Sequence, residues 1–324
     1  MGLKPRFTGL IAATYTPLDR DGALCLPQVG PMVDRLLASG VNGLYVCGST
    51  GEGMSLTVEE RKSLAREFIR CTANRAPVMI QVGHNCLADA AALAADAQAA
   101  GADVISATCP SYYPIGSLDV LIDSMAQIAA AAPELPFYYY HIPVLTGVEF
   151  PMVEFLPRAA KRIENLAGLK FTKPTIHEFQ QCQDLDAGRF DVLWGLDEML
   201  LSALAVGAQG AIGSTYNIAA PLYSKIIEAF AGGNMNEAQR LQSQAVQFIQ
   251  TIAQFPFHPA MKEILRWQGI DCGPARLPMA SLTEQQANNL RCDLEQIDFA
   301  ALTGRPFVCN GSLEAVSTNQ KEAV

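Results

Sequence analysis

Short apolar segments alternate with amphipathic segments along most of this 324-residue chain, and this alternation restricts the fold more than any other feature. The apolar segments recur roughly every thirty residues, the spacing of parallel strands joined by crossover helices. Eight strands are expected, at residues 9–16, 43–47, 78–82, 104–108, 137–140, the segment ending at Lys170, 192–195 and 210–212. Eight strands, each followed by a helix, predict an α/β protein with a closed (β/α)₈ TIM barrel rather than an open sheet.

After residue 230 helical segments follow one another without strands between them. We expect residues 1–230 to form the barrel and catalytic domain, residues 231–300 a C-terminal extension, and residues 301–324 a tail that frays from about Gly311. The extension should contain three helices, at residues 234–253, 259–268 and 283–294.

Composition excludes several classes of partner. The formal net charge is −9 and no basic block is present, which argues against nucleic acid and anionic membrane surfaces but leaves an anionic small molecule possible. No run of about 18 apolar residues and no apolar signal segment are found, so a cytoplasmic protein is expected. The nine cysteines form no C-x-x-C pair and are interpreted as scattered core residues in a reducing compartment.

Lys170 ends the apolar run of the sixth strand, within N-L-A-G-L-K-F-T at residues 165–172. The strand ends of a barrel share one mouth, where its functional side chains gather. A lysine is normally a solvated charge, but a partly dry pocket favours the neutral amine, which can attack a ketone and form a Schiff base. The alternative is that Lys170 only marks where the strand leaves the core.

Two further strand ends carry polar groups. The second strand ends in G-S-T-G-E-G, residues 48–53, where backbone N–H groups and the hydroxyls of Ser49 and Thr50 can hold a carboxylate; an ordinary tight turn is the alternative. The fifth strand ends at Tyr140, whose phenol can pass protons between substrate and solvent. Tyr138 and Tyr139 are interpreted as packing residues.

The sixth, seventh and eighth strands are also followed by polar residues. Asp197 and Glu198 follow the seventh strand, as acids that either bind a ligand or cap the next helix. The residues from Gly213 to Thr215 follow the eighth, where barrels often bind phosphate. Thr172 shares a face with Lys170 by strand parity, unless it is only a β-former.

Metal chemistry is less favoured by the sequence, and no metal site is predicted. The four histidines, His84, His141, His177 and His258, lack ligand spacing such as H-x-x-x-H. They are interpreted as surface or structural residues. His141 follows Tyr140 and is expected to point to the opposite side of the strand.

Five motifs in this order, G-S-T-G-E, Y-H-I-P, G-L-K-F-T, G-L-D-E and G-S-T-Y-N, resemble the class I aldolases of the dihydrodipicolinate synthase and N-acetylneuraminate lyase family. The match spans roughly residues 8–295. The resemblance implies a TIM barrel with a C-terminal helical extension, a homotetramer, and no metal or organic cofactor. It also implies that Lys170 forms the Schiff base with pyruvate, Tyr140 relays protons, and Ser49 and Thr50 hold the pyruvate carboxylate.

Within the family the sequence is more similar to the lyases than to the synthases. It reads K-F-T rather than K-E-A, and I-P-V-L-T-G where synthases read V-P-S-R-T-G, so Leu145 replaces the arginine that handles a dicarboxylic substrate. The resemblance places the sugar tail on Thr172, Gly195, Asp197, Glu198 and Ser214, and a contact with a neighbouring subunit on Tyr112 or Tyr113.

The implied activity is that of a carbon–carbon lyase, which reversibly cleaves N-acetylneuraminate, a sialic acid, to N-acetylmannosamine and pyruvate. One alternative is another pyruvate-dependent aldolase, such as a 2-keto-3-deoxy sugar acid aldolase or a synthase-like enzyme. The other is a barrel that binds a ligand without catalysis. The presence of both Lys170 and Tyr140 favours an enzyme over the binding module.

Overall fold

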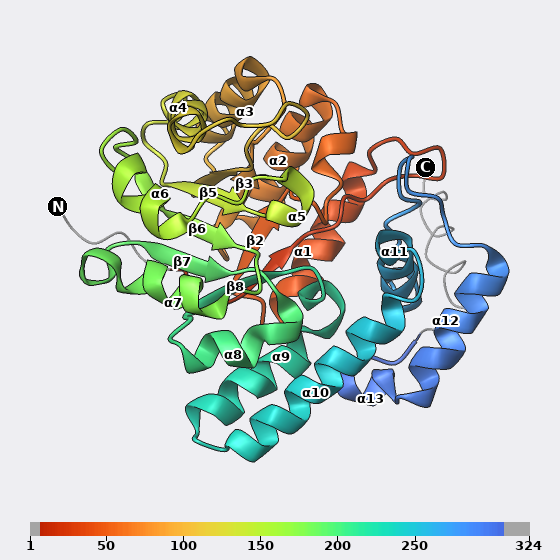
Figure 1. Cartoon of the computed structure of the whole chain (residues 1–324). Coiled ribbons are helices and arrows are strands. Elements are labelled where there is room, and N and C mark those ends of the chain that lie inside the picture. The colour runs from red at the N-terminus through yellow and green to blue at the C-terminus, as the bar shows by residue number, and fades with distance from the viewer. Residues whose placement is uncertain (1–6, 308–324) are drawn as a thin grey trace.

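The chain folds into a closed barrel of eight parallel strands, as expected from the sequence (Figure 1). The computed structural model describes residues 7–307. The strands are β1 Gly9–Ala13, β2 Gly43–Val46, β3 Val78–Gln81, β4 Val104–Ala107, β5 Phe137–His141, β6 Leu166–Phe171, β7 Asp191–Trp194 and β8 Gly210–Gly213. Each strand pairs with the next, and β1 pairs with β8 with Gly9 beside Gly210, which closes the barrel.

Alternating side chains divide each strand between two cores. Outward residues such as Leu169 and Phe171 pack against the helices in one large apolar cluster. Inward residues, including Tyr45, Tyr138 and Tyr140, form a second cluster inside the barrel. Because side chains alternate along a strand, Lys170 lies on the inward side of β6, directly beside Tyr140 in the strand register.

Helices follow the strands and cover the outside of the barrel (Figure 1). They are α1 Val29–Ala38, α2 Val58–Thr72, α3 Leu87–Ala99, α4 Leu118–Ala129, α5 Pro143–Thr146, α6 Met152–Ala159, α7 Ile176–Asp184, α8 Leu200–Ala205 and α9 Tyr216–Ala231. A capping box starts α2, in which Thr57 and Glu60 exchange hydrogen bonds. No helix between residues 7 and 307 has the length and apolar character required to cross a membrane.

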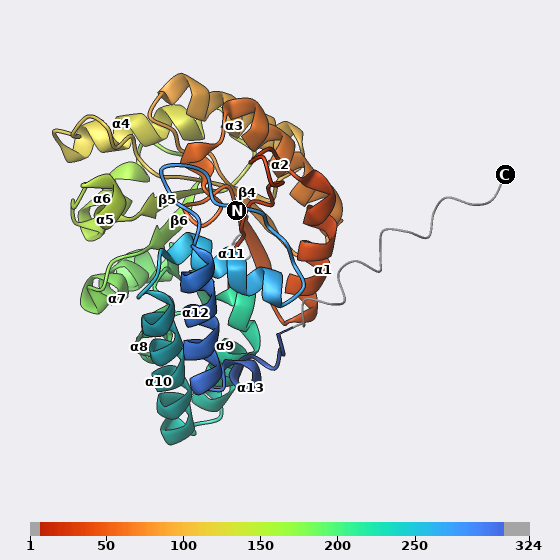
Figure 2. The same cartoon turned by 90° about the vertical axis from the view of Figure 1, so that its right-hand side faces the viewer.

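The C-terminal extension contains the three expected helices, α10 Met235–Ile252, α11 Phe257–Trp267 and α12 Glu284–Gln296. A further short helix, α13 Phe299–Thr303, was not expected and crosses the boundary placed at residue 300. The tail expected to fray from about Gly311 lies outside the described residues. Two views show α11 on the side toward which the strands point, lying across the barrel mouth (Figures 1 and 2). The extension therefore faces the carboxyl ends of the strands.

Candidate active site

A cavity of about 210 Å³ lies at the carboxyl ends of the strands and is lined in part by residues of α11. Nine residues predicted from the sequence to bind substrate or carry out chemistry line this cavity: Ser49, Thr50, Tyr140, Lys170, Thr172, Gly195, Asp197, Glu198 and Ser214. They come from five strand ends, which the closed barrel brings to one mouth. The structure thus brings these nine side chains and backbone segments together around one space.

Lys170 is buried between two aromatic rings at the floor of the cavity. Its Nζ lies 4.1 Å from the centre of the Tyr140 ring and 4.3 Å from the centre of the Tyr45 ring. Only 4% of the residue is exposed, so little water reaches the amine. Aromatic faces attract cations, and they replace part of the hydration that Lys170 loses on burial.

Tyr45 is an aromatic neighbour that sequence reasoning missed. It belongs to the inward face of β2, and its ring meets that of Tyr140 edge to face at 5.7 Å. Its hydroxyl is 3.2 Å from Ser106 Oγ, and burial raises the pKa of Tyr45 well above its usual value. In the sequence Tyr45 is one apolar strand residue among several, so no local signal separates it from ordinary packing.

Residues 48–53 form a compact turn, which we name the cradle turn. Its backbone is closed by hydrogen bonds from Gly53 N to Gly48 O and from Glu52 N to Ser49 O, both 3.1 Å long. Thr16 Oγ1 donates to Gly51 O at 2.5 Å. Among the described residues, none accepts a hydrogen bond from the backbone N–H of Ser49 or Thr50. These donors remain available for an anion, which supports a carboxylate cradle rather than an ordinary tight turn.

Asp197 is a buried carboxylate fixed by the loop after β8. Its Oδ2 accepts hydrogen bonds from Thr215 N at 2.9 Å and from Thr215 Oγ1 at 2.6 Å. Tyr223 OH lies 2.7 Å from the same Thr215 hydroxyl, and it must donate because Thr215 gives its own proton to Asp197. Burial raises the pKa of Asp197 to about 6, although the Thr215 hydrogen bonds oppose this shift.

These contacts bear on the interpretations left open by the sequence. Neither Asp197 nor Glu198 caps the helix that follows: residues 197–199 form a short 3₁₀ turn before α8, and no side chain caps either element. Asp197 instead binds Thr215. A phosphate site after β8 is disfavoured because Thr215 already donates its backbone N–H and hydroxyl, and the nearby carboxylates would repel an anion.

Two glycines pack closely against residues that line the cavity. A Cβ atom at Gly195 would lie 2.0 Å from Thr172 Oγ1, and one at Gly213 would lie 2.1 Å from Asp197 Oδ1. Both positions therefore require glycine. Thr172 Oγ1 is buried and has no hydrogen-bond partner among the described residues. A buried hydroxyl without a partner at a cavity wall is suited to a polar ligand group.

Glu198 differs from Asp197 because it is exposed at the rim of the cavity. Its backbone is held by the extension: Gln242 Nε2 of α10 donates to Glu198 O at 3.0 Å, and Gln242 Oε1 accepts from Leu201 N at 2.9 Å. Gln242 thus fixes the segment that carries both acids, although its own side chain does not line the cavity.

The extension also supplies part of the cavity wall, which sequence reasoning missed. Ile249, Phe257 and His258 line the cavity beside the strand-end residues. His258 was interpreted as a surface or structural residue, but its Nε2 lies 3.1 Å from Ser49 O in the cradle turn. Burial lowers the pKa of His258. No motif marks these residues, because their place depends on how α10, which carries Ile249, and α11 dock on the barrel.

Two predicted features lie away from this cavity. Tyr112 and Tyr113 are 77% and 78% exposed, and their rings meet edge to face at 4.9 Å. Leu145, on α5, is exposed and does not line the cavity. Tyr112 therefore does not contact the active-site cavity of its own chain. The position of Leu145 does not test whether its replacement of arginine disfavours a dicarboxylic substrate.

The histidines are dispersed in the structure. His141 points away from Tyr140, as expected, and packs against Phe171 outside the barrel. Burial lowers the pKa of His141 to about 4. Between residues 7 and 307, no group of three or more His, Cys, Asp and Glu side chains is placed to hold a metal ion.

Comparison with known protein families identifies the chain. The model of the dihydrodipicolinate synthetase family matches residues 6–297. This chain belongs to the dihydrodipicolinate synthetase family. The family assignment agrees with the barrel, the extension and the cavity described above, and it confirms the resemblance found in the sequence motifs.

Several similar proteins are named as sialic acid lyases or aldolases. An N-acetylneuraminate lyase of Xenopus tropicalis is 41% identical, over 90% of this chain and 97% of its own length. The solved structure of an N-acetylneuraminate lyase (sialic acid aldolase) from Aliivibrio salmonicida is 37% identical, with a TM-score of 0.89 over 91% of this chain and 98% of that one. A Ruminococcus gnavus sialic acid aldolase altered at its catalytic lysine is 27% identical, with a TM-score of 0.86 over 91% and 96%.

Proposed function

We propose that this chain is a Schiff-base class I aldolase that reversibly cleaves N-acetylneuraminate to N-acetylmannosamine and pyruvate. The observation that carries the proposal is the burial of Lys170 between two aromatic rings, in a cavity that also contains a carboxylate cradle and fixed acids. The lyase names of relatives covering almost the whole chain support the same substrate.

The cradle turn and Lys170 bind the keto-acid end of the substrate. The free N–H groups and hydroxyls of Ser49 and Thr50 donate hydrogen bonds to the carboxylate, which places the C2 ketone of the open-chain sugar near Lys170 Nζ. The neutral amine adds to C2 to give a carbinolamine, whose hydroxyl takes up a proton and leaves as water, so that a protonated iminium remains. The Tyr45 and Tyr140 ring faces stabilise this cation as they stabilise the ammonium.

The iminium then acts as the electron sink for cleavage. The C4 hydroxyl loses its proton, the C3–C4 bond breaks, and its electron pair forms an enamine while the aldehyde N-acetylmannosamine leaves. Protonation of the enamine at C3 and hydrolysis of the iminium release pyruvate and restore the amine. Tyr140 lines the cavity beside Lys170 and relays the proton between the substrate hydroxyl and C3.

Selection of a polyhydroxylated tail comes from the cavity residues that follow β6, β7 and β8. Asp197 and Glu198 accept hydrogen bonds from sugar hydroxyls, while Thr172 and Ser214 provide further hydroxyl partners. Gly195 leaves the room that the Thr172 side chain needs at this wall. This set of acceptors suits a neutral polyol and disfavours a second carboxylate, as a dicarboxylic aldehyde would bring.

The proposal includes a homotetramer in the cytoplasm. The exposed pair Tyr112 and Tyr113 provides an aromatic surface at the end of β4, of the kind that buries well against a second copy. Light scattering of the purified protein should give four times the 34.8 kDa chain mass, and a monomer would contradict this part of the proposal. Fractionation of the source cells tests the location.

Borohydride trapping tests the chemistry directly. Pyruvate with borohydride should inactivate the protein and leave a reduced pyruvyl adduct on the peptide containing Lys170, whereas an adduct on another lysine, or none, contradicts the assignment. A substrate panel followed by pyruvate release tests the sugar. Faster release from a 2-keto-3-deoxy sugar acid, or faster condensation of aspartate semialdehyde with pyruvate, would favour the other aldolases of the family. Activity that survives EDTA would support the expected lack of a metal.

A further inference from the structure

We propose that Lys262, in the C-terminal helix α11, is a positioning residue that holds the cradle turn through a buried ion pair with Glu52. The inference rests on the proposed function, because it assumes that the cradle turn binds the carboxylate of the keto acid. Under this proposal the C-terminal extension contributes to substrate affinity, in addition to covering the barrel mouth.

The cradle turn has a backbone that needs support from outside. Glu52 and Cys47, the residue just before the turn, both have positive φ, 55° and 60° respectively, which L-residues with a side chain rarely adopt. A Cβ atom at Gly53 would lie 2.0 Å from Cys47 O, so the turn is closely packed and position 53 requires glycine. Conformations of this kind persist only where neighbouring contacts enforce them.

One of these contacts is the Lys262–Glu52 pair. Lys262 Nζ lies 2.6 Å from Glu52 Oε1, and the two side chains are 3% and 0% exposed. Glu52 Oε1 has no aligned hydrogen-bond donor, so this contact acts through charge. Lys262 Nζ also donates to Pro274 O at 2.8 Å, and Glu52 Oε2 accepts from Arg276 N at 2.8 Å. Both buried charges are therefore compensated, which such pairs require.

A second contact runs from the same face of α11. His258 is one helical turn before Lys262, and its Nε2 lies 3.1 Å from Ser49 O. A carbonyl can only accept, so Nε2 carries the proton. Because the trans peptide plane points its carbonyl and N–H in opposite directions, the N–H of Thr50 points away from α11. Thus α11 fixes the orientation of a donor in the cradle.

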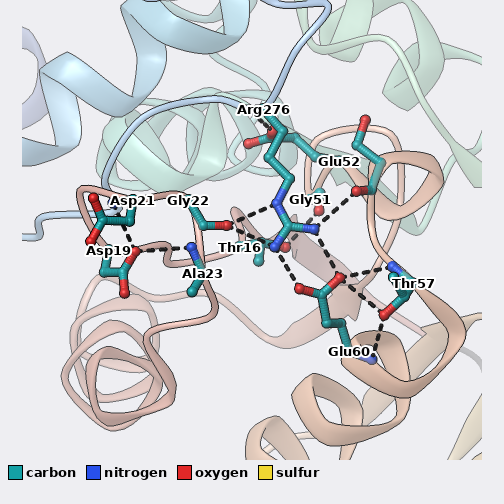
Figure 3. A network of polar contacts seen from close by, with 11 residues as sticks. Thr16, Asp19, Asp21, Gly22, Ala23, Gly51, Glu52, Thr57, Glu60 and Arg276 are labelled. Atoms are coloured by element: carbon teal, nitrogen blue, oxygen red, sulfur yellow. Dashed lines mark hydrogen bonds and ion pairs between the residues drawn. The ribbon is translucent and has the colours of Figure 1, made fainter.

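The segment after α11 completes the attachment. The guanidinium of Arg276 donates to Gly22 O at 2.7 Å, to Ser55 O at 3.0 Å and to the Glu60 carboxylate at 2.5 Å (Figure 3). Figure 3 shows Arg276 between the loop after β1 and the start of α2, beside Glu52. Neither Lys262 nor Glu52 lines the active-site cavity, so their effect on substrate must act through the cradle turn.

The test compares pyruvate trapping in variants of the full-length protein. Lys262→Met removes the charge but keeps an apolar stem. The pyruvate concentration for half-maximal borohydride trapping should rise about tenfold, while the trapping rate at saturation should fall less than about threefold. Glu263→Gln is the matched control, because it changes the next residue of α11, which pairs with Arg266 instead. It should leave both values unchanged.

A lone buried charge can unfold a protein, so Glu52→Gln/Lys262→Met is made in parallel. This double variant carries no isolated charge and should fold. Its pyruvate concentration for half-maximal trapping should again be about tenfold higher than that of the wild type. If either variant folds and reaches half-maximal trapping at the same pyruvate concentration as the wild type, the proposal is overturned. Failure of both variants to fold also overturns it, since the pair would then serve stability alone.

Hydrogen exchange separates this inference from the proposed function. If the wild type does not trap pyruvate, the proposed function fails, but the role of Lys262 remains testable. Backbone amides of the cradle turn should exchange at least about tenfold faster in Lys262→Met than in the wild type or Glu263→Gln, with no ligand present. Equal exchange rates would show that Lys262 does not hold the turn.

Discussion

Replacement of Thr215 by Val should shift the pH dependence of catalysis, because Thr215 holds Asp197. The substitution is nearly isosteric and removes the hydroxyl that donates to Asp197 Oδ2 at 2.6 Å. A hydrogen bond to a charged group contributes about 1.5 to 3 kcal/mol, and about 1.4 kcal/mol corresponds to one pKa unit. The pKa of Asp197, about 6 in the wild type, should therefore rise to about 7 or above.

The sign follows from the role proposed for the carboxylate. Ionised Asp197 accepts hydrogen bonds from the sugar, so kcat/KM for N-acetylneuraminate should increase as pH rises through about 6 in the wild type. In Thr215→Val the increase should occur about one unit higher. At pH 6 the ionised fraction falls from about one half to about one tenth, a roughly fivefold loss of kcat/KM that largely disappears by about pH 8.5.

The assay is pyruvate release measured from pH 5 to 8.5, with Thr215→Ser as the control. Serine keeps the hydroxyl and also the partner that Tyr223 requires, so its profile should overlay that of the wild type. A loss of kcat/KM in Thr215→Val that is equal at every pH would refute the argument. It would mean that Thr215 shapes the cavity without controlling the ionisation of Asp197.

Three further predictions follow from the site and its supports. Tyr140→Phe should lower kcat by roughly 10² to 10⁴ with little change in the unfolding free energy; a loss below about threefold would mean that Tyr140 only packs. Asp197→Asn and Glu198→Gln should each lower kcat/KM for N-acetylneuraminate by roughly ten- to hundredfold, with the smaller loss at the exposed Glu198, while pyruvate trapping survives; normal cleavage by both would remove the main support for the sugar assignment. The hydrogen bond from Arg276 lowers the pKa of Glu60 from 4.5 to about 2, so the stabilisation from Glu60 is complete above its unfolded pKa and is lost as pH falls through 2. Urea unfolding should thus show a larger gap between wild type and Glu60→Gln at pH 6 than at pH 3.5, and an equal gap would contradict the linkage.

Much of the fold could be predicted from the sequence because its signals are local. The repeated apolar segments and the capping box at Thr57 are set by neighbours a few residues away, and a closed barrel is the architecture that accommodates eight such repeats. The barrel then explains why strand-end residues far apart in the chain, such as Ser49, Lys170 and Asp197, line one cavity.

The residues that sequence reasoning missed depend on contacts between distant elements. Tyr45 looks like an ordinary strand residue until closure of the barrel sets its ring against Lys170. His258 belongs to an amphipathic helix whose docking over the mouth decides what it touches. Helix α13 is too short for a periodic pattern to identify.

The two acids after β7 show which properties of a residue the sequence determines and which the tertiary structure determines. The motif G-L-D-E places Asp197 and Glu198 at a strand end, and that position was fixed by sequence alone. Their environments were not, because burial and hydrogen bonding come from elements elsewhere in the chain. Asp197 is buried against Thr215, which raises its pKa to about 6, whereas Glu198 stays exposed at the rim. Desolvation depends on everything that packs around a charge, so only the folded chain decides it.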